Sequence, residues 1–228
     1  MMSIRVGCCG FPRRKEEYFQ EFKLVEIQQT FYKPPFLKTV ERWREEAPED
    51  FEFSLKAWQL ITHLPSSPTY HKDGLLIPVG KESNYGFFKP SEEVFEAWTK
   101  TRDIAQVLKA KVIVFQCPAS FVETAENIKN MTMFFTNVDR GDFIFVWEPR
   151  GKWSDDVIMA LRTEVGIIIG ISLIHCVDPL ERRALYGETR YFRLHGGRNY
   201  RHQYTDDELA KLLQEAGDEA YILFNNKI

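Results

Sequence analysis

Short apolar runs recur along this chain, and most of them end in a charged, amide or imidazole side chain. Several runs are apolar throughout, as is typical of parallel strands that are covered on both faces. They predict eight strands, over residues 4–8, 24–27, 51–55, 112–115, 143–147, 167–173, 191–194 and 220–224. If these strands are parallel, the polar groups at their carboxyl ends meet at one rim, where such sheets and barrels bind ligands.

Helical patterns separate the predicted strands. The clearest one starts at Thr205, because Thr205 and Glu208 have the spacing of a capping box and Gly217 ends the apolar stripe. Four further helices are predicted to begin at Thr39, Ser91, Thr124 and Ser154. The first of these ends at Ala47, since the proline that follows cannot continue a helix.

Alternation of strands and helices through eight strands predicts a (β/α)8 TIM-like barrel, in a single domain over residues 1–228. An open, doubly wound sheet is the alternative, but eight strands in a chain of 228 residues favour closure. The chain ends at Ile228, shortly after the last predicted strand, so the closing C-terminal helix of such a barrel is expected to be missing. We therefore expect one bare flank, over which a second copy could associate.

The stretch over residues 64–90 is rich in proline and glycine and predicts no long element. Loops of this length are uncommon in compact domains and are often lids or binding loops. The aromatic side chains of Tyr70, Tyr85, Phe87 and Phe88 favour a lid above the rim. A surface excursion without a function is the alternative.

The composition is that of an ordinary globular protein, with 44% hydrophobic and 28% charged residues. A net charge of −3 argues against a globally basic nucleic-acid binder, although a local basic rim stays open. The chain shows neither a signal-like start nor an apolar run near the roughly 20 residues of a membrane span. We therefore expect a cytoplasmic protein with no membrane partner, and cysteines that are reduced.

Seven separated motifs follow the predicted strands in order. They are Gly7-Cys8-Cys9-Gly10-Phe11, Val25-Glu26-Ile27-Gln28-Gln29-Thr30-Phe31-Tyr32, Phe53-Ser54-Leu55-Lys56-Ala57, Phe115-Gln116-Cys117-Pro118-Ala119-Ser120-Phe121, Trp147-Glu148-Pro149-Arg150-Gly151-Lys152-Trp153, Arg193-Leu194-His195-Gly196 and Phe224-Asn225-Asn226. Together they resemble the DUF72, or YecE-like, family over nearly the whole chain. The resemblance implies a TIM-like barrel with its pocket at the carboxyl ends of the strands, and it implies no particular reaction. Cys8 and Cys9 depart from the family's usual Thr-Ser.

Glu26 and Glu148 follow the second and fifth predicted strands and could face each other across the barrel mouth. Two such carboxylates could act as acid and base, or share a metal ion. The alternative is that each is held in an ion pair, Glu26 by Lys56 and Glu148 by Arg150. A partner is needed in either case, because a buried unpaired charge is costly.

Lys56 follows the third predicted strand, among Leu55, Ala57 and Trp58. Apolar surroundings lower the pKa of a lysine and can make it a nucleophile, as in enzymes that form Schiff bases. If an ion pair keeps Lys56 charged, it could instead hold a phosphate or a carboxylate.

Arg193 and His195 lie two residues apart at the end of the seventh predicted strand and should face the same side. Arg193 suits a bidentate anion clamp, and His195 suits proton transfer. The loop that follows contains Gly196, Gly197 and Arg198, at a place where barrels often bind phosphate. A solvated polar loop is the alternative.

Further side chains near the predicted strand ends are expected to bind substrate. They are Tyr32, His63, Gln116, Arg150, Trp153 and Asn225. No cofactor is established, but a divalent metal ion could be held by ligands drawn from Glu26, Glu148, His175, His195, His63 and Cys117. No short ligand spacing supports that site. Asp103 and Asp178 are interpreted as solvated charges of helical regions.

The leading hypothesis is an enzyme that hydrolyses a phosphoester in a small anionic substrate. Lys56 and Arg193 then hold the anion, while Glu26, Glu148 and His195 handle protons. Nucleic acid is a candidate substrate by analogy of fold alone. The alternatives are a sugar-phosphate isomerase or Schiff-base lyase that uses Lys56, and a non-catalytic barrel that binds a ligand or a partner.

Overall fold

Eight parallel strands close into a barrel in chain order, so that each strand pairs with the next and β8 pairs with β1. The computed structural model describes residues 3–71, 74–169, 173–181, 189–197 and 199–226. The strands are β1 (Ser3–Cys9), β2 (Leu24–Ile27), β3 (Glu52–Lys56), β4 (Val112–Gln116), β5 (Ile144–Glu148), β6 (Ile174–Val177), β7 (Arg190–Leu194) and β8 (Glu219–Phe224). The predicted TIM-like barrel is therefore confirmed.

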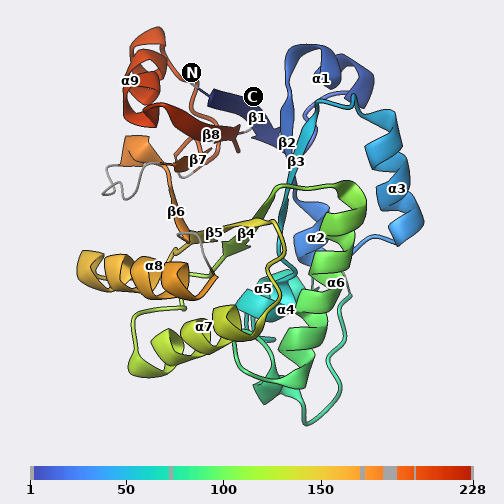
Figure 1. Cartoon of the computed structure of the whole chain (residues 1–228), viewed down its shortest axis with the longest axis vertical. Coiled ribbons are helices and arrows are strands. Elements are labelled where there is room, and N and C mark those ends of the chain that lie inside the picture. Colours follow the sequence, from blue (N-terminus) through green and yellow to red (C-terminus); the bar gives the residue numbers. More distant parts are fainter. Residues whose placement is uncertain (1–2, 72–73, 170–172, 182–188, 198, 227–228) are drawn as a thin grey trace.

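Helices surround the strands (Figure 1). The longer ones are α1 (Lys15–Glu21), α3 (Leu37–Glu46), α6 (Glu92–Leu108), α7 (Ala125–Asn137), α8 (Asp155–Ile169) and α9 (Asp206–Ala216). Short helices α2 (Gln29–Tyr32), α4 (Gln59–Thr62) and α5 (Pro68–His71) and the 3-10 turns η1 (Glu82–Asn84) and η2 (Pro179–Glu181) lie in the loops. None of the described helices combines the length and apolar character needed to cross a bilayer.

Three of the predicted helix starts are confirmed by their capping bonds. The hydroxyl of Ser91 accepts the Val94 N–H at 3.3 Å, and that of Thr124 accepts the Asn127 N–H at 3.1 Å. Thr205 forms both bonds of the predicted capping box. These bonds satisfy backbone donors that a helix start otherwise leaves unpaired.

The sixth strand lies further along the chain than predicted. Residues up to Ile169 continue helix α8, and β6 begins only at Ile174. A continuous apolar run does not distinguish a buried strand from a buried stretch of helix, so the strand predicted over 167–173 was wrong at residues 167–169, which are helical. Residues 170–172 of that prediction lie outside the described residues. As a result Asp178, and not His175, is the residue that follows β6 at Val177.

The inside of the barrel is apolar over most of its length and polar at one end. Its interior cluster is Leu24, Val112, Val114, Val146, Ile174, Cys176, Tyr191, Tyr221 and Leu223. Because alternate residues of a strand face the same side, the next positions toward the carboxyl ends continue this inner face. They are Glu26, Gln116, Glu148, Asp178, Arg193 and Asn225. The polar rim therefore continues the inner face of the same strands.

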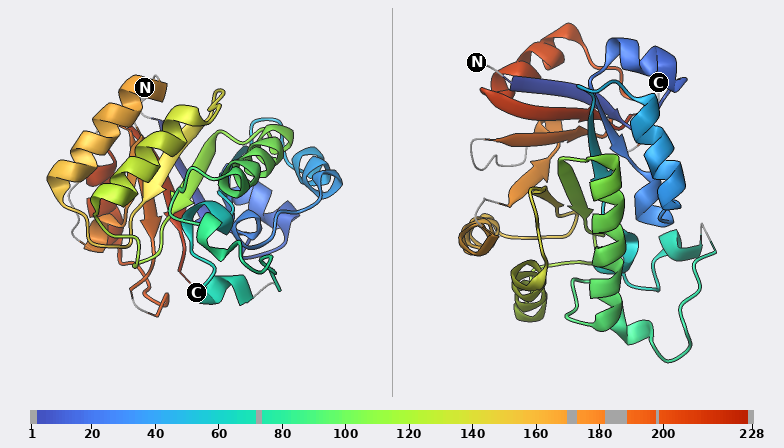
Figure 2. Two further views of the ribbon diagram at one scale, coloured as in Figure 1. Left: turned by 90° about the horizontal axis from the view of Figure 1, so that it is seen from below. Right: turned by 45° about the vertical axis from the view of Figure 1, so that its right-hand side comes forward.

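The segment over residues 64–90 is anchored in the core at several points. Tyr70, Tyr85 and Phe88 are buried, whereas Leu76 and Val79 between them are almost fully exposed. Figure 2 (left) shows this segment, in teal, at the same end of the barrel as the loop after β7. Its role as a lid remains a prediction.

Gly86→Ala should lower thermal stability more than Gly80→Ala does. Both glycines have left-handed backbone, with φ of 77° and 85°, so both variants carry a similar strain of roughly 1–2 kcal/mol. A Cβ on Gly86 would also lie 2.3 Å from the carbonyl oxygen of His63, whereas a Cβ on Gly80 meets nothing within 4 Å. Thermal unfolding of the two variants measures the difference. Equal losses would show that this contact does not anchor the segment.

Candidate functional site

A buried guanidinium, that of Arg193 on β7, joins two carboxylates across the barrel mouth. Its Nη2 lies 2.9 Å from Glu26 Oε1 on β2, and its Nη1 bonds Glu148 Oε2 at the end of β5. Nη1 also donates to Gln116 Oε1 at 3.2 Å. Arg193 is 1% exposed, Glu26 0% and Glu148 5%. Charges so far from water are tolerated because they neutralise one another.

Both oxygens of Glu26 are occupied. The hydroxyl of Tyr191 lies 2.8 Å from Oε2, and the amide of Gln28 donates to Oε1 beside the Arg193 contact. The sequence had left open a pair between Glu26 and Lys56. In the structure Arg193 takes that place, because it reaches Glu26 from across the barrel.

Glu148 forms a second ion pair on its other oxygen. Oε1 lies 3.0 Å from Arg150 Nη2 and 3.0 Å from His195 Nε2, so the expected pair with Arg150 is formed. Burial by itself would raise the pKa of Glu148, but Arg193, Arg150 and His195 together hold that pKa well below its ordinary value. Glu148 therefore stays ionised and anchors the groups around it.

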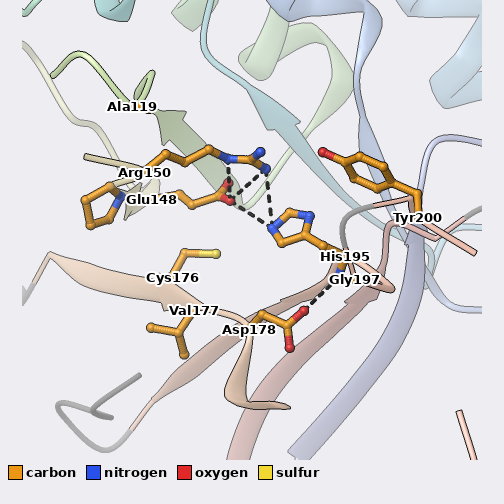
Figure 3. A pocket seen from close by; sticks show the side chains of 10 residues that line it. Ala119, Glu148, Arg150, Cys176, Val177, Asp178, His195, Gly197 and Tyr200 are labelled. Atoms are coloured by element: carbon orange, nitrogen blue, oxygen red, sulfur yellow. Dashed lines mark hydrogen bonds and ion pairs between the residues drawn. The ribbon is translucent and has the colours of Figure 1, made fainter. Parts of the chain in front are cut away.

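His195 is held through both ring nitrogens. Nδ1 lies 3.0 Å from Asn225 Nδ2. Nε2 lies 3.0 Å from Glu148 Oε1, and the backbone N–H donates to Asp178 Oδ2 at 2.8 Å (Figure 3). An amide can turn either a donor or an acceptor toward Nδ1. The imidazole can thus keep both contacts whether it is neutral or protonated.

A pocket of about 330 Å³ opens beside these groups. It is lined by Ala119, Glu148, Pro149, Arg150, Cys176, Val177, Asp178, His195, Gly197 and Tyr200. Tyr200 reaches toward Arg150 in Figure 3, and its ring meets His195 edge-on with 6.0 Å between centroids. Its backbone is left-handed, with φ of 57°, a conformation that is uncommon outside glycine and clusters at functional sites. Such a pocket suits a small molecule.

Lys56 is buried at the end of β3, with 4% of its surface exposed. Its Nζ lies 3.8 Å from the centroid of the Phe31 ring. None of the ion pairs formed within the described ranges includes Lys56. Burial first and repulsion by Arg193 second lower the pKa of Lys56 to about 7, against the opposing pull of Glu26 and Glu148.

Two further residues predicted for the site lie on this side of the rim. The rings of Tyr32 and His63 each have their centroid 4.9 Å from that of Phe31. Burial, followed by Lys56 and Arg150, lowers the pKa of His63 to about 3, so its ring is neutral. This side of the rim therefore holds two nitrogen bases whose protonated forms are disfavoured.

Several other predicted site residues do not line the pocket. His175 alternates with the inward-facing residues of β6 and faces the helices, and Cys117 is buried in the cluster between sheet and helices. Trp153 packs in that cluster and donates its indole N–H to a backbone carbonyl at 2.8 Å. Gly196 is buried and its N–H bonds the Tyr204 hydroxyl. Arg198 lies outside the described residues.

The side chains that the sequence suggested as metal ligands do not form a common site in the described structure. Across the described residues, no three His, Cys, Asp or Glu side chains lie where they could hold an ion together. The reason is the position of Arg193, whose guanidinium lies between Glu26 and Glu148 where a shared ion would have to lie. His175 and Cys117 face away, as described above.

Asp178 corrects another interpretation from the sequence. It was taken as a solvated charge, yet it is 5% exposed and lines the pocket. The error follows from the misplaced sixth strand, because Asp178 carries the same signal as Glu26 and Glu148, a polar residue at a strand end. Tyr200, by contrast, comes from the loop after β7, whose path depends on the fold.

Comparison with known proteins identifies a family and a fold. The model of the family described as "Protein of unknown function DUF72" matches residues 11–228. Among proteins of curated function, none matches this chain.

Three solved structures have a similar fold. A DUF72 family protein from Enterococcus faecalis is 20% identical, with a TM-score of 0.69 over 100% of this chain and 92% of that one. Another, from Thermotoga maritima, is 19% identical, with a TM-score of 0.65 over 98% and 92%. D-psicose 3-epimerase, in the presence of D-fructose, is 8% identical, with a TM-score of 0.59 over 98% and 85%. At these identities the likeness extends to the fold alone.

Arg193→Ala should lower the free energy of unfolding by about 3–5 kcal/mol, because it leaves Glu26 buried without a cation and Glu148 with only Arg150. The control is Arg13→Ala, which breaks an exposed pair with Glu21 and should cost less than ~1 kcal/mol. Denaturant unfolding at pH 7 measures both losses. Similar small values would contradict a structural role for the Arg193 pairs.

Lys56→Met should stabilise the protein at pH 6–7, and the gain should vanish near pH 10. The native pKa of Lys56 is about 7, and that of an unfolded lysine is about 10.4. Below pH 7 both states are protonated, and the native state bears the full penalty of a buried ammonium. Between these values the unfolded state binds more protons, so wild-type stability rises by up to ~1.4 kcal/mol per pH unit.

Unfolding curves across pH 6–10 measure this effect, and Lys129→Met, on an exposed position of α7, is the control. Parallel stability profiles for wild type and Lys56→Met would mean that Lys56 titrates as an ordinary lysine.

Proposed function

This chain belongs to the DUF72 family of proteins of unknown function, and we propose that its barrel rim is the active site of an isomerase or epimerase. In this proposal the ligand is a small, uncharged polyhydroxylated carbonyl compound, such as a sugar. The reaction is a proton transfer next to its carbonyl group. The observation that carries the proposal is the imidazole of His195, held between Glu148 and Asn225 at the wall of an open pocket.

The guanidinium groups around the pocket are already paired with carboxylates. Carboxylates come from Glu26, Glu148 and Asp178, and both guanidinium groups, of Arg193 and Arg150, are already in ion pairs. A phosphate bound at these guanidinium groups would compete with the carboxylates already bound to them, so the ion pairs favour an uncharged ligand over a phosphoester or nucleic acid at this rim. Hydroxyl groups of an uncharged ligand can donate and accept without breaking an ion pair.

Proton transfer needs a group at the pocket wall that can gain and lose a proton. His195 lines the pocket; its Nε2 keeps the contact to Glu148, and its Nδ1 exchanges a proton with the ligand in place of its contact to the neutral amide of Asn225. The ionised Glu148 orients the ring and stabilises the imidazolium that forms, the role a carboxylate has beside a catalytic histidine. Glu148 is thus a positioning residue, and His195 is the group that meets the ligand.

The fold supports the same class of ligand at a coarser level. D-psicose 3-epimerase, solved in the presence of D-fructose, shares the barrel over 98% of this chain. This is an analogy of fold, which raises the expectation for a sugar and specifies no residue.

Hydrogen exchange with solvent tests the proposal. Incubated with ketoses and aldoses in D2O, the protein should introduce deuterium at the carbon next to the carbonyl group of one of them, as followed by NMR. His195→Asn should slow this exchange by roughly 10²–10⁴-fold, the usual contribution of an acid–base group. His71→Asn, the same change at an exposed histidine of α5, should leave the rate unaltered.

Absence of exchange with every sugar, together with tight binding of inorganic phosphate, would contradict the proposal and favour an anionic ligand. Equal slowing by His195→Asn and His71→Asn would instead remove His195 from the reaction.

A further inference from the structure

We propose that Lys56 is a carbonyl-reactive amine, which forms a Schiff base with an aldehyde or ketone at the barrel rim beside Phe31. This inference deepens the proposed function, on which it rests only for the class of ligand. It adds a covalent site that proton transfer by His195 does not require.

Residues of β3 and α2 together position the Lys56 amine. Lys56 is the last residue of β3, and its carbonyl oxygen accepts a 2.7 Å hydrogen bond from the Thr30 hydroxyl. Its Nζ lies over the face of Phe31, 3.8 Å from the ring centroid. Because Thr30 and Phe31 are neighbours in α2, one helical turn positions both the backbone and the amine of Lys56.

Among the residues that the structure describes, no carboxylate forms an ion pair with the Lys56 amine. Glu26 and Glu148 are the carboxylates that act on it electrostatically, and the ion pairs they form in the described structure are with Arg193, Arg150 and His195. The charged or titratable groups that face Lys56 are Glu26 from β2, Glu148 from β5, Arg150 after β5, Arg193 from β7 and His63 after α4. The guanidinium groups of Arg193 and Arg150 thus disfavour the protonated form of the amine, whereas Glu26 and Glu148 form their ion pairs with other residues.

This geometry explains the low pKa of Lys56. Burial is the largest cause and Arg193 the next, and together they lower the pKa to about 7. The face of Phe31 favours a cation, but such an interaction is too weak to restore an ordinary lysine pKa. At pH 7 about half of the Lys56 amine is therefore uncharged, against roughly one part in 2,500 for an exposed lysine.

An uncharged amine has the lone pair that Schiff-base formation needs. The nitrogen attacks the carbonyl carbon, the π electrons of the carbonyl move to its oxygen, and a proton passes from nitrogen to that oxygen to give a carbinolamine. Loss of water then forms the C=N bond, and hydrolysis reverses the sequence. The step consumes no oxidant and no reductant.

Arg150, which is 31% exposed, lines the pocket, and its charge acts on Lys56, which does not itself line the pocket. The inferred covalent site therefore lies beside the lining of the pocket and is distinct from it.

Reductive trapping tests the inference. The protein is incubated with dihydroxyacetone and cyanoborohydride, which converts any imine to a stable secondary amine, and the modified lysines are assigned by peptide mass spectrometry. At pH 7, Lys56 should be modified at least about tenfold faster than the exposed Lys129, because far more of its amine is uncharged. The ratio should fall toward one at pH 10, where exposed lysines also lose their proton.

Two variants and a binding measurement separate the outcomes. Lys56→Met, which should fold because it removes a buried charge, must lose the adduct, and Lys129→Met must keep it. Modification of Lys56 no faster than of Lys129 at pH 7 overturns the inference, and if calorimetry still detects D-fructose binding, the proposed function survives. If Lys56 is trapped rapidly but the protein neither binds a sugar nor catalyses solvent exchange, the reactivity of the Lys56 amine is supported and the proposed function is contradicted.

Discussion

The ion pairs of one buried guanidinium arrange all the other charges at this barrel mouth. Arg193 binds Glu26 and Glu148 at the same time, and the three side chains are almost completely removed from water. Each charge alone would cost several kcal/mol to bury, so the three are stable only as a set. Because they come from β7, β2 and β5, the set also ties opposite walls of the barrel together.

These ion pairs also determine which titratable side chains at the barrel mouth remain available for a reaction. Both oxygens of Glu26 and of Glu148 are bonded to neighbouring side chains, and in the proposed function these carboxylates position their neighbours, whereas the sequence had suggested that they handle protons. Lys56 loses the carboxylate partner expected for it and its pKa falls to about 7. His195 remains at the pocket wall with both nitrogens bonded. In the proposed function, nitrogen bases therefore meet the ligand and carboxylates position them.

The wrong position predicted for the sixth strand led to wrong predictions of site residues. The apolar run over 167–173 was assigned to a strand, although a helix end and a buried strand look alike in hydropathy. Because of that error, Asp178 was not predicted to be a site residue, whereas His175, which faces the helices, was considered as a metal ligand. The place of Tyr200 at the pocket depends on the left-handed backbone of the loop after β7, which no local pattern specifies.

Local patterning was enough to assign the barrel, seven of its strands and the end at which its polar groups gather. Period-two alternation and strand ends are properties of short segments, and they are written in neighbouring residues. The choice of ion-pair partners is not local. Arg193 and Glu26 are 167 positions apart in the sequence, yet they form an ion pair because the closed barrel brings them together. As a result, Glu26 does not pair with Lys56. Coulomb and desolvation energies depend on the distances between charges and on burial, which exist only after the barrel has closed.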